Sequence, residues 1–218
     1  MPSAIIIANG QWLEGAAVHT VLSHQDESFI ICADGGANHA FKQGIRPDIL
    51  IGDLDSVDDQ VLQTYRQDQI SILQYPPVKN ETDLQLCLLF AAEKNFDSIC
   101  ILAGFGDEID HQLANILLLS DPAFVDMNIY FAHGDQLLYL WRQGQHTLSG
   151  QPGERVSLIP IGADAVAVTT TGLLYPLVNE NLIFGPARGM SNEMTGSEAQ
   201  ITFTQGLLVA VHTLKERA

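Results

Sequence analysis

The sequence predicts an α/β protein in which an N-terminal, mostly parallel sheet with flanking helices is followed by a smaller C-terminal all-β sandwich. From residue 4 to about residue 131, short apolar segments alternate with longer segments that carry apolar residues at helical spacing. Beyond Trp141 the helical pattern stops, and short strand-like segments follow at close spacing. The chain has 218 residues, 46% of them hydrophobic, which is enough to form a substantial core.

The predicted strands of the first domain are nearly all continuously apolar, as in a sheet that is buried on both faces. The segment Asp83–Lys94 has the clearest helix start, because Thr82 serves as an N-cap and Gln85 stands three positions later, as in a capping box. The predicted strands are Ala4–Ala8, Phe29–Ala33, Ile49–Gly52, Ile70–Leu73, Ser98–Ala103 and Met127–Phe131. The predicted helices are Ala37–Gln43, Val57–Arg66, Asp83–Lys94 and His111–Leu119.

The second domain is predicted to span residues 144–218, after a first domain of residues 1–143. It begins with Gly144–Gly153, which is rich in Gly, Gln and Pro and is expected to be a loop. The turn signals Ile161-Gly162 and Gln205-Gly206 separate its expected strands. A β domain of about 70 residues is small for an independent unit, so we expect it to pack on the first domain or on a second subunit. The expected strands are Arg155–Pro160, Ala165–Thr170, Gln200–Thr204 and Leu207–His212.

The charge and the cysteines limit the function classes. Ten Lys and Arg against 26 Asp and Glu give a net charge of −16, which argues against a nucleic-acid partner and favours cationic ligands. Cys32, Cys87 and Cys100 lie in apolar segments and are expected to be buried thiols in a reducing compartment. The start lacks a basic leader, and no uninterrupted apolar segment reaches about 18 residues. We therefore expect a cytoplasmic protein without membrane contact.

Acidic residues follow the predicted strands at the sheet edge where open parallel sheets bind ligands. Asp34 follows the second strand, and Gly35 and Gly36 come directly after it, which frees the backbone to approach a ligand or another element closely. A glycine pair at a strand–helix turn is also ordinary turn geometry, so this motif alone does not establish a site.

The third strand is followed by two acids, Asp53 and Asp55. If the strand continues through them, their carboxylates point to one side and Leu54 faces the core. Two adjacent carboxylates repel unless a cation or a proton lies between them, and Mg²⁺ is the cation that such oxygen ligands favour. The alternative is an acidic, solvated loop in which Asp55 caps a helix.

Two further motifs open predicted helices. Lys79 is expected to hold a phosphate and Asp83 to add a third carboxylate, although a Thr cap and an acid in the first turn are also ordinary helix stabilisers. Asp110 and His111 follow a glycine-containing loop, and His111 and Asn115 lie on one helical face. Five acids at one edge of one sheet predict a metal–nucleotide site: Asp34, Asp53, Asp55, Asp83 and Asp110.

The order and spacing of these motifs resemble those of the thiamine pyrophosphokinase family, and the resemblance covers nearly the whole chain. The N-terminal segments that carry it are Asp34–Asn38, Pro47–Ser56, Lys79–Asp83 and Gly104–Asn115. In the C-terminal domain, the segments similar to the family's β-sandwich motifs are Thr171-Gly172-Leu173, Phe184-Gly185 and Ser191-Asn192.

The resemblance implies an ATP-dependent enzyme that transfers the pyrophosphoryl group of ATP to the hydroxyl of thiamine, giving thiamine diphosphate and AMP. It implies a homodimer whose active sites lie between the α/β domain of one subunit and the β-sandwich of the other. It implies that Mg²⁺ is bound by Asp53, Asp55 and Asp83, and that Asp110 joins these three as a catalytic residue. The ATP-binding residues would be Asp34, Gly35, Gly36, Asn38, Lys79, Thr82 and His111, and the thiamine-binding residues Tyr175, Ser191, Asn192 and Asn115. The group that accepts the hydroxyl proton stays open between Asp83, Asp110 and a phosphate oxygen.

Three positions depart from the family pattern. Glu108 stands where the family usually has Arg, Asn80 where Asp is frequent, and Tyr175 where Trp is common. The charge reversal at Glu108 puts one expected phosphate contact in doubt. Arg188 and Lys79 are the candidates to replace it.

Two other functions fit parts of the sequence. The segment Ile49–Val57 resembles the Asp-x-Asp signature of aspartyl-phosphate phosphatases, in which Asp53 would be the nucleophile. Against this, two predicted strands precede the segment, and the C-terminal domain would be unexplained. The chain could instead bind thiamine or a nucleotide without turning it over. A purely structural role for the acids predicts that Mg²⁺ has no effect on stability.

Overall fold

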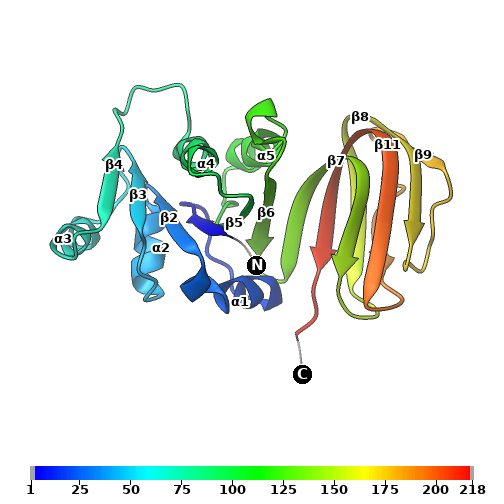
Figure 1. Cartoon of the computed structure of the whole chain (residues 1–218), viewed down its shortest axis with the longest axis horizontal. Helices are drawn as coiled ribbons and strands as arrows, with labels where there is room; N and C mark the ends of the chain where they lie inside the picture. The colour runs from blue at the N-terminus through cyan, green and yellow to red at the C-terminus, as the bar shows by residue number, and fades with distance from the viewer. Residues whose placement is uncertain (1–2, 217–218) are drawn as a thin grey trace. The chain divides into compact units, whose positions relative to one another are not determined.

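The computed structural model describes residues 3–216 and divides into two compact units (Figure 1). The first, here the α/β unit, comprises the residues up to Glu14 together with Val18–His133. The second, here the β unit, comprises Gly15–Ala17 and the residues from Gly134 onward. None of the helices within residues 3–216 is long and apolar enough to cross a membrane.

In the α/β unit, strands and helices alternate along the chain, and each predicted element is present within two residues of its expected ends. One helix was not predicted: α1 (Ala16–Leu22) contains three β-branched residues and has no acid in its first turn, so its sequence gives little helix signal. The strands are β1 (Ala4–Ile7), β2 (Phe29–Ala33), β3 (Ile49–Gly52), β4 (Ser71–Gln74), β5 (Ser98–Leu102) and β6 (Asn128–His133). The other helices are α2 (Gly36–Lys42), α3 (Asp59–Gln67), α4 (Asp83–Glu93) and α5 (Ile109–Leu118), with short 3-10 turns at Gln25–Glu27 and Pro122–Phe124.

The six strands of this unit form a parallel sheet in the order β6-β5-β1-β2-β3-β4. The strand order reverses at β1, which pairs with β2 on one side and with β5 on the other. In doubly wound sheets such a switch point opens a crevice beyond the carboxyl ends of the strands. The core is continuous across the central strands, where Ile5, Ile6 and Ile7 are fully buried. The three cysteines are buried free thiols, as expected.

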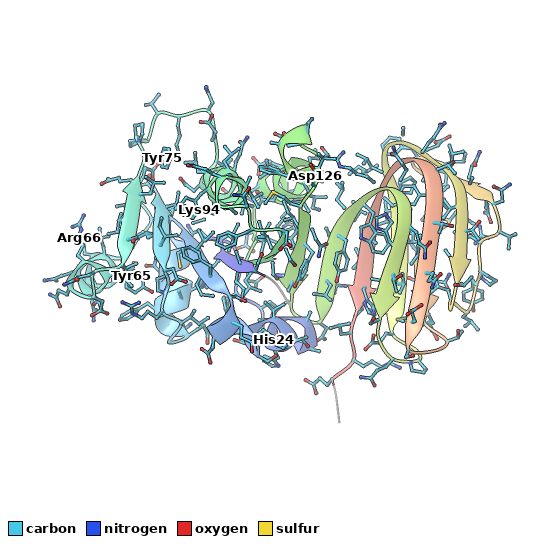
Figure 2. All side chains as sticks on the ribbon, viewed as in Figure 1. His24, Tyr65, Arg66, Tyr75, Lys94 and Asp126 are labelled. Carbon is cyan, nitrogen blue, oxygen red and sulfur yellow. The ribbon has the colours of Figure 1, made fainter. Side chains whose placement is uncertain are left out.

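Helix α2 packs unusually close to β1. A side-chain carbon added at Gly36 would collide with the carbonyl oxygen of Ile7, and one added at Gly35 would collide with the side chain of Asn9. Both glycines are therefore explained by close packing of the helix start on the strand end. Tyr65 of α3, labelled in Figure 2, donates its hydroxyl to the carbonyl oxygen of Ala37 at 3.2 Å and so ties α3 to α2.

The β unit is built on three long antiparallel strands, with β11 (Glu198–Thr213) between β7 (Gln136–Ser149) and β8 (Arg155–Thr171). Two short strands, β9 (Glu180–Leu182) and β10 (Asn192–Glu193), pair with β8. From Gly134 to residue 216 the structure contains no helix, as predicted. Trp141, Leu158, Ile201 and Phe203 belong to the buried cluster that forms the core of the unit.

The loop and turn predictions for this region are partly wrong. The predicted loop Gly144–Gly153 is strand as far as Ser149, so the expected domain boundary at residue 143/144 falls inside β7. The expected turns at Ile161-Gly162 and Gln205-Gly206 lie within β8 and β11. The pairing register of β11 shifts between Gln205 and Leu207, and Gly206 has a φ of +95°. Glycine here marks a bulge that bends a long strand, where the sequence pattern had indicated its end.

Candidate active site

A cavity of about 780 Å³ lies at the carboxyl ends of β1, β2, β3 and β5 in the α/β unit. This is the edge of the sheet, at the switch point, where the sequence predicted a metal–nucleotide site. The strand ends contribute Ala8, Asn9, Gly10, Gln11, Ala33, Asp34, Asp53, Asp55, Ser56, Ala103, Gly104 and Gly106 to its lining. The segment around the start of α4 contributes Pro77, Lys79, Glu81, Thr82, Asp83 and Leu84, and that around α5 contributes Asp107, Glu108, His111 and Asn115.

Three carboxylates converge in this cavity: one oxygen of each of Asp34, Asp53 and Asp83 lies within 4.8 Å of the others. Asp34 is only 4% exposed, and its Oδ1 is buried without a hydrogen-bond partner. Gly52 permits the approach, because an added side-chain carbon there would lie 2.9 Å from the Cβ of Asp34 and 3.2 Å from Oδ1 of Asp83. Clustered oxygen ligands, one of them buried and unpartnered, are chemically suited to a hard divalent cation such as Mg²⁺.

Lys79 contacts two of these acids. Its Nζ lies 2.7 Å from Oδ2 of Asp53 and 3.2 Å from Oδ1 of Asp83. The hydrogen bond from Lys79 holds the pKa of Asp53 below its usual value, and the same bond raises the pKa of Lys79. Burial raises the pKa of Asp83, although its contact with Lys79 acts in the opposite direction. The cluster thus combines three acids with one ammonium group.

The carboxylate group differs in one member from the predicted set of Asp53, Asp55 and Asp83, because Asp34 belongs to it and Asp55 does not. Strand β3 ends at Gly52, and Leu54 has a φ of +73°, so the alternation that would bring Asp53 and Asp55 to one side is broken. Leu54 is nevertheless buried, as expected. Asp55 lines the same cavity, where its Oδ1 accepts a hydrogen bond of 2.9 Å from Ser56 Oγ.

The predicted ATP-binding residues divide into two groups. Thr82 lines the cavity and caps α4, since its Oγ1 accepts a hydrogen bond of 3.2 Å from the backbone N–H of Gln85. Asn38, like Gly35 and Gly36, is not among the lining residues. Its side-chain nitrogen donates to the carbonyl oxygen of Ser56 at 2.9 Å, and its oxygen accepts from the backbone N–H of Asp58 at 3.0 Å. Asn38 therefore holds the loop that carries Asp53 and Asp55.

The α5 residues show a similar division. His111 and Asn115 both line the cavity, as expected for one helical face. Asn115 donates to the carbonyl oxygen of Gly104 at 2.7 Å and so fastens the loop after β5. Asp110 does not line the cavity, and its Oδ1 accepts from the backbone N–H of His111 at 3.0 Å. Glu108 lines the cavity, with its Oε2 3.4 Å from Nε2 of His111.

The other predicted thiamine-binding residues lie in the β unit. Tyr175 and Asn192 line a hollow of about 60 Å³. Two hydrogen bonds join them, from the backbone N–H of Tyr175 to Oδ1 of Asn192 at 3.0 Å and from Nδ2 of Asn192 to the carbonyl oxygen of Tyr175 at 2.7 Å. Ser191 does not line the hollow, and its backbone N–H donates to Ser157 Oγ at 3.0 Å.

Neither candidate replacement for the arginine expected at position 108 is free in this structure. The guanidinium of Arg188 makes two hydrogen bonds to Glu180, at 2.8 and 3.1 Å. Lys79 is held by its two aspartates.

One wall of the cavity was not predicted from the sequence, and it is formed by Asn9, Gly10 and Gln11. The carbonyl oxygen of Gly10 accepts a hydrogen bond of 2.7 Å from Nε2 of His39, which fixes this loop against α2. The position of the loop directly after β1, at the same sheet edge as the predicted acids, was the signal that could have identified it.

Comparison with known proteins gives one consistent result. The family profile "Thiamin pyrophosphokinase, catalytic domain" matches residues 21–131, and the profile "Thiamin pyrophosphokinase, vitamin B1 binding domain" matches residues 145–208. Thiamine pyrophosphokinase 3 of Oryza sativa subsp. japonica is 31% identical over 199 residues, covering 80% of this chain and 74% of that protein. Thiamine pyrophosphokinase of Bacillus subtilis is 29% identical over 184 residues, covering 84% of this chain and 86% of that protein.

Solved structures agree with the sequence comparisons. The crystal structure of thiamine pyrophosphokinase from Bacillus subtilis superimposes with a TM-score of 0.84 at 26% identity, covering 98% of this chain and all of that one. No phosphatase is among these relatives, and the phosphatase interpretation is not favoured. The two profiles cover both units of the structure, and the motifs that carry the resemblance fall inside them. The chain belongs to the thiamine pyrophosphokinase family.

Proposed function

We propose that this protein transfers the pyrophosphoryl group of ATP to the hydroxyl of thiamine, giving thiamine diphosphate and AMP. The observation that carries the proposal is the cluster of Asp34, Asp53, Asp83 and Lys79 in a large cavity at the switch point of a sheet that belongs to this family. Catalysis of pyrophosphoryl transfer depends mainly on positioning the reactants and on neutralising the charge of the phosphates, and this cluster contains groups suited to both.

Asp34, Asp53 and Asp83 are proposed to hold Mg²⁺, with Asp55 on the wall of the same cavity as a further catalytic acid. The bound ion would neutralise charge on the ATP phosphates, so that the thiamine hydroxyl could attack the phosphorus of the pyrophosphoryl group that is transferred. Thr82 lies at the N-terminus of α4, where backbone N–H groups favour anions, and is proposed to contact the phosphates together with Lys79.

The β unit is proposed to supply most of the thiamine site. The paired segments of Tyr175 and Asn192 present an aromatic ring that is 61% exposed, and such a ring can stack on a cationic heterocycle. Ser191 is proposed to act beside Asn192. From the α/β unit, Asn115 and His111 are proposed to complete the cleft, and Asp110 to act through its bond to the backbone of His111.

We further propose a homodimer in which the β unit of one copy completes the cavity of the other. On α5, the apolar side chains of Ile109, Leu113 and Leu117 recur every four residues and are 71%, 57% and 49% exposed. In the β unit, Val178 and Phe184 are 78% and 55% exposed. Exposed apolar stripes of this kind are typical of subunit contacts. A cytoplasmic location is proposed with this, because all three thiols are free and buried.

A product assay tests the proposed function. The protein is incubated with ATP, Mg²⁺ and thiamine, and nucleotides and thiamine diphosphate are resolved chromatographically, beside an Asp83→Ala variant. Equal amounts of AMP and thiamine diphosphate, lost in the variant, are expected. Free phosphate without AMP would instead indicate a phosphatase, and saturable thiamine binding without product would indicate a non-catalytic binding protein.

A further inference from the structure

The Lys79 side chain contacts two of the three acids in the cluster. Its ammonium group contacts Asp53 at 2.7 Å and Asp83 at 3.2 Å, and the side chain is only 11% exposed. If phosphate binding were the only role of this lysine, its ammonium group would be expected to be hydrated in the nucleotide-free protein, because ammonium groups are strongly solvated. Lys79 is instead bound to the acids of its own chain.

The contacts of the individual oxygens show what a metal ion would meet. Oδ2 of Asp53 contacts Lys79, and Oδ1 accepts a hydrogen bond of 3.4 Å from the backbone N–H of Asp55, so both oxygens are in use. Oδ1 of Asp83 faces the same ammonium group. Asp34, 4% exposed, has a buried Oδ1 without a hydrogen-bond partner. A divalent cation shared by all three acids would therefore lie beside, or replace, the ammonium of Lys79.

We propose that Lys79 is an internal counter-cation that competes with the metal for these carboxylates, so that metal enters the site effectively only together with the nucleotide. The proposal deepens the proposed function, and it rests on that function because it requires ATP phosphates in this cavity. Lys79 then has two roles: it holds the acids together in the nucleotide-free protein, and its ammonium group contacts a phosphate oxygen when the nucleotide is bound.

The physical reason is that an ammonium and a divalent cation repel strongly when they share the same carboxylates. A phosphate is a good alternative partner for lysine, because it is negatively charged and the flexible lysine side chain can bring its ammonium group to it. Nucleotide binding would thus draw the ammonium away and release oxygens for the metal. By thermodynamic reciprocity, metal and nucleotide must then raise each other's affinity by the same factor.

Binding of Mn²⁺ to the full-length protein tests the inference without an activity readout. Mn²⁺ shares the octahedral oxygen preference of Mg²⁺, and electron paramagnetic resonance reports its free concentration. Affinity is measured first without nucleotide and then with the non-transferable analogue α,β-methylene-ATP. The variants are Lys79→Met, Lys79→Arg, which keeps the charge, and Lys42→Met, which removes a charge from an exposed position on α2. Circular dichroism confirms that each variant is folded, and Lys79→Gln replaces Lys79→Met if the latter is not.

Without nucleotide, Lys79→Met is expected to bind Mn²⁺ at least about tenfold more tightly than the wild type, while Lys79→Arg and Lys42→Met stay close to it. The analogue should tighten Mn²⁺ binding to the wild type and have a smaller effect on Lys79→Met. Equal or weaker nucleotide-free binding by Lys79→Met would overturn the inference and leave the proposed function standing. If the wild type bound no Mn²⁺ even with the analogue, the proposed metal site would fall, and the inference with it.

Discussion

The side-chain amide of Asn38 donates a hydrogen bond of 2.9 Å to the backbone carbonyl oxygen of Ser56 and so joins helix α2 to the acidic loop after β3. The same side chain accepts from the backbone of Asp58 at 3.0 Å. One residue outside the cavity thereby fixes the loop that carries Asp53 and Asp55. Asn38, which the sequence analysis expected to bind ATP, is not among the residues that line the cavity, and its side-chain hydrogen bonds go to the backbone of this loop.

Replacing Asn38 with Ala should lower catalytic efficiency because the loop loses two bonds, each of which contributes about 1 kcal/mol. We expect kcat/KM to fall roughly tenfold, mostly through kcat, and the melting temperature to fall by a few degrees. Steady-state kinetics and thermal unfolding check both. The matched control is Gln63→Ala, an exposed amide side chain on α3. A change in the KM for ATP alone would mean that Asn38 contacts the nucleotide directly.

Replacing Asp34 with Asn should stabilise the metal-free protein while removing its response to metal. Three carboxylates with one ammonium leave net repulsion around a buried oxygen that lacks a partner, and Asn removes one of the charges. We expect the melting temperature without metal to rise and the stabilisation by Mg²⁺ with ATP to disappear. Differential scanning calorimetry with and without Mg²⁺ measures both. An unchanged metal response in the variant would remove Asp34 from the metal site.

The acid at position 108 should weaken ATP binding. Glu108 lines the cavity with its side chain 74% exposed, so it repels phosphate only through solvent. We expect Glu108→Gln to lower the KM for ATP a few-fold, and Glu108→Arg to lower it further by adding a phosphate contact. Initial-rate kinetics at two salt concentrations distinguish the charge effect, which salt should reduce. A rise in KM for both variants would show that Glu108 has acquired a useful role of its own.

If the active site is shared between subunits, mixing two inactive variants should restore part of the activity. Asp83→Ala removes a residue of the α/β unit, and Asn192→Ala removes one of the β unit. In a mixed dimer whose sites are formed between subunits, one of the two sites carries both changes and the other carries neither. We expect subunit exchange at equal amounts to restore about a quarter of wild-type activity. Analytical ultracentrifugation verifies the dimer. If mixed dimers form and stay inactive, each site is built from a single chain.

Lowering the pH should reduce the stability of the folded β unit, because His146 becomes protonated. Its ring stacks on Trp141 at 4.6 Å, and its Nε2 donates to the carbonyl oxygen of Arg142 at 2.7 Å. Burial lowers the pKa of His146, although the bond to Arg142 acts against this shift. The folded protein therefore binds the proton less readily than the unfolded chain, whose histidine titrates near about 6.5. Stability from the neutral ring is complete above about pH 6.5 and is lost as the pH falls toward the folded pKa.

Thermal unfolding between about pH 7.5 and pH 5.5 measures this loss, and His146→Phe, which keeps an aromatic stack, should show a smaller decrease than the wild type. Burial also lowers the pKa of His133 and His212, so part of the decrease should persist in the variant. An NMR titration that placed the pKa of His146 above the free value would contradict the expected direction.

The sequence predicted the α/β unit well because its buried parallel strands are short, apolar and bounded by clear turn residues. It placed the acids at the correct edge for the same reason, since parallel strands end together. It could not predict that Leu54 adopts a positive φ, because a non-glycine residue there gives no signal. Membership of Asp34 in the carboxylate group depends on Gly52 and on packing across strands, which no local pattern encodes.

The β unit was harder to predict because glycine is found both in turns that end a strand and in bulges within one. Gly162 and Gly206 have positive φ values, as turn glycines do, yet they lie inside long strands. Sequence spacing alone does not distinguish a bulge from a turn. The wall formed by Asn9, Gly10 and Gln11 was not predicted for another reason, because uncharged residues in a loop give no chemical signal in the sequence.

All three thiols of the chain, at Cys32, Cys87 and Cys100, are buried in the α/β unit, and the sequence places no cysteine beyond residue 100. Burial raises the pKa of each thiol, which suppresses the reactive thiolate while the unit is closed. A thiol-specific reagent would therefore label the protein only when the α/β unit opens, and opening of the β unit alone would leave the thiols unlabelled. Because of this natural distribution of cysteines, the rate of thiol labelling measures how often the α/β unit opens. Slower labelling in the presence of ATP would report occupancy of the cavity without any engineered probe.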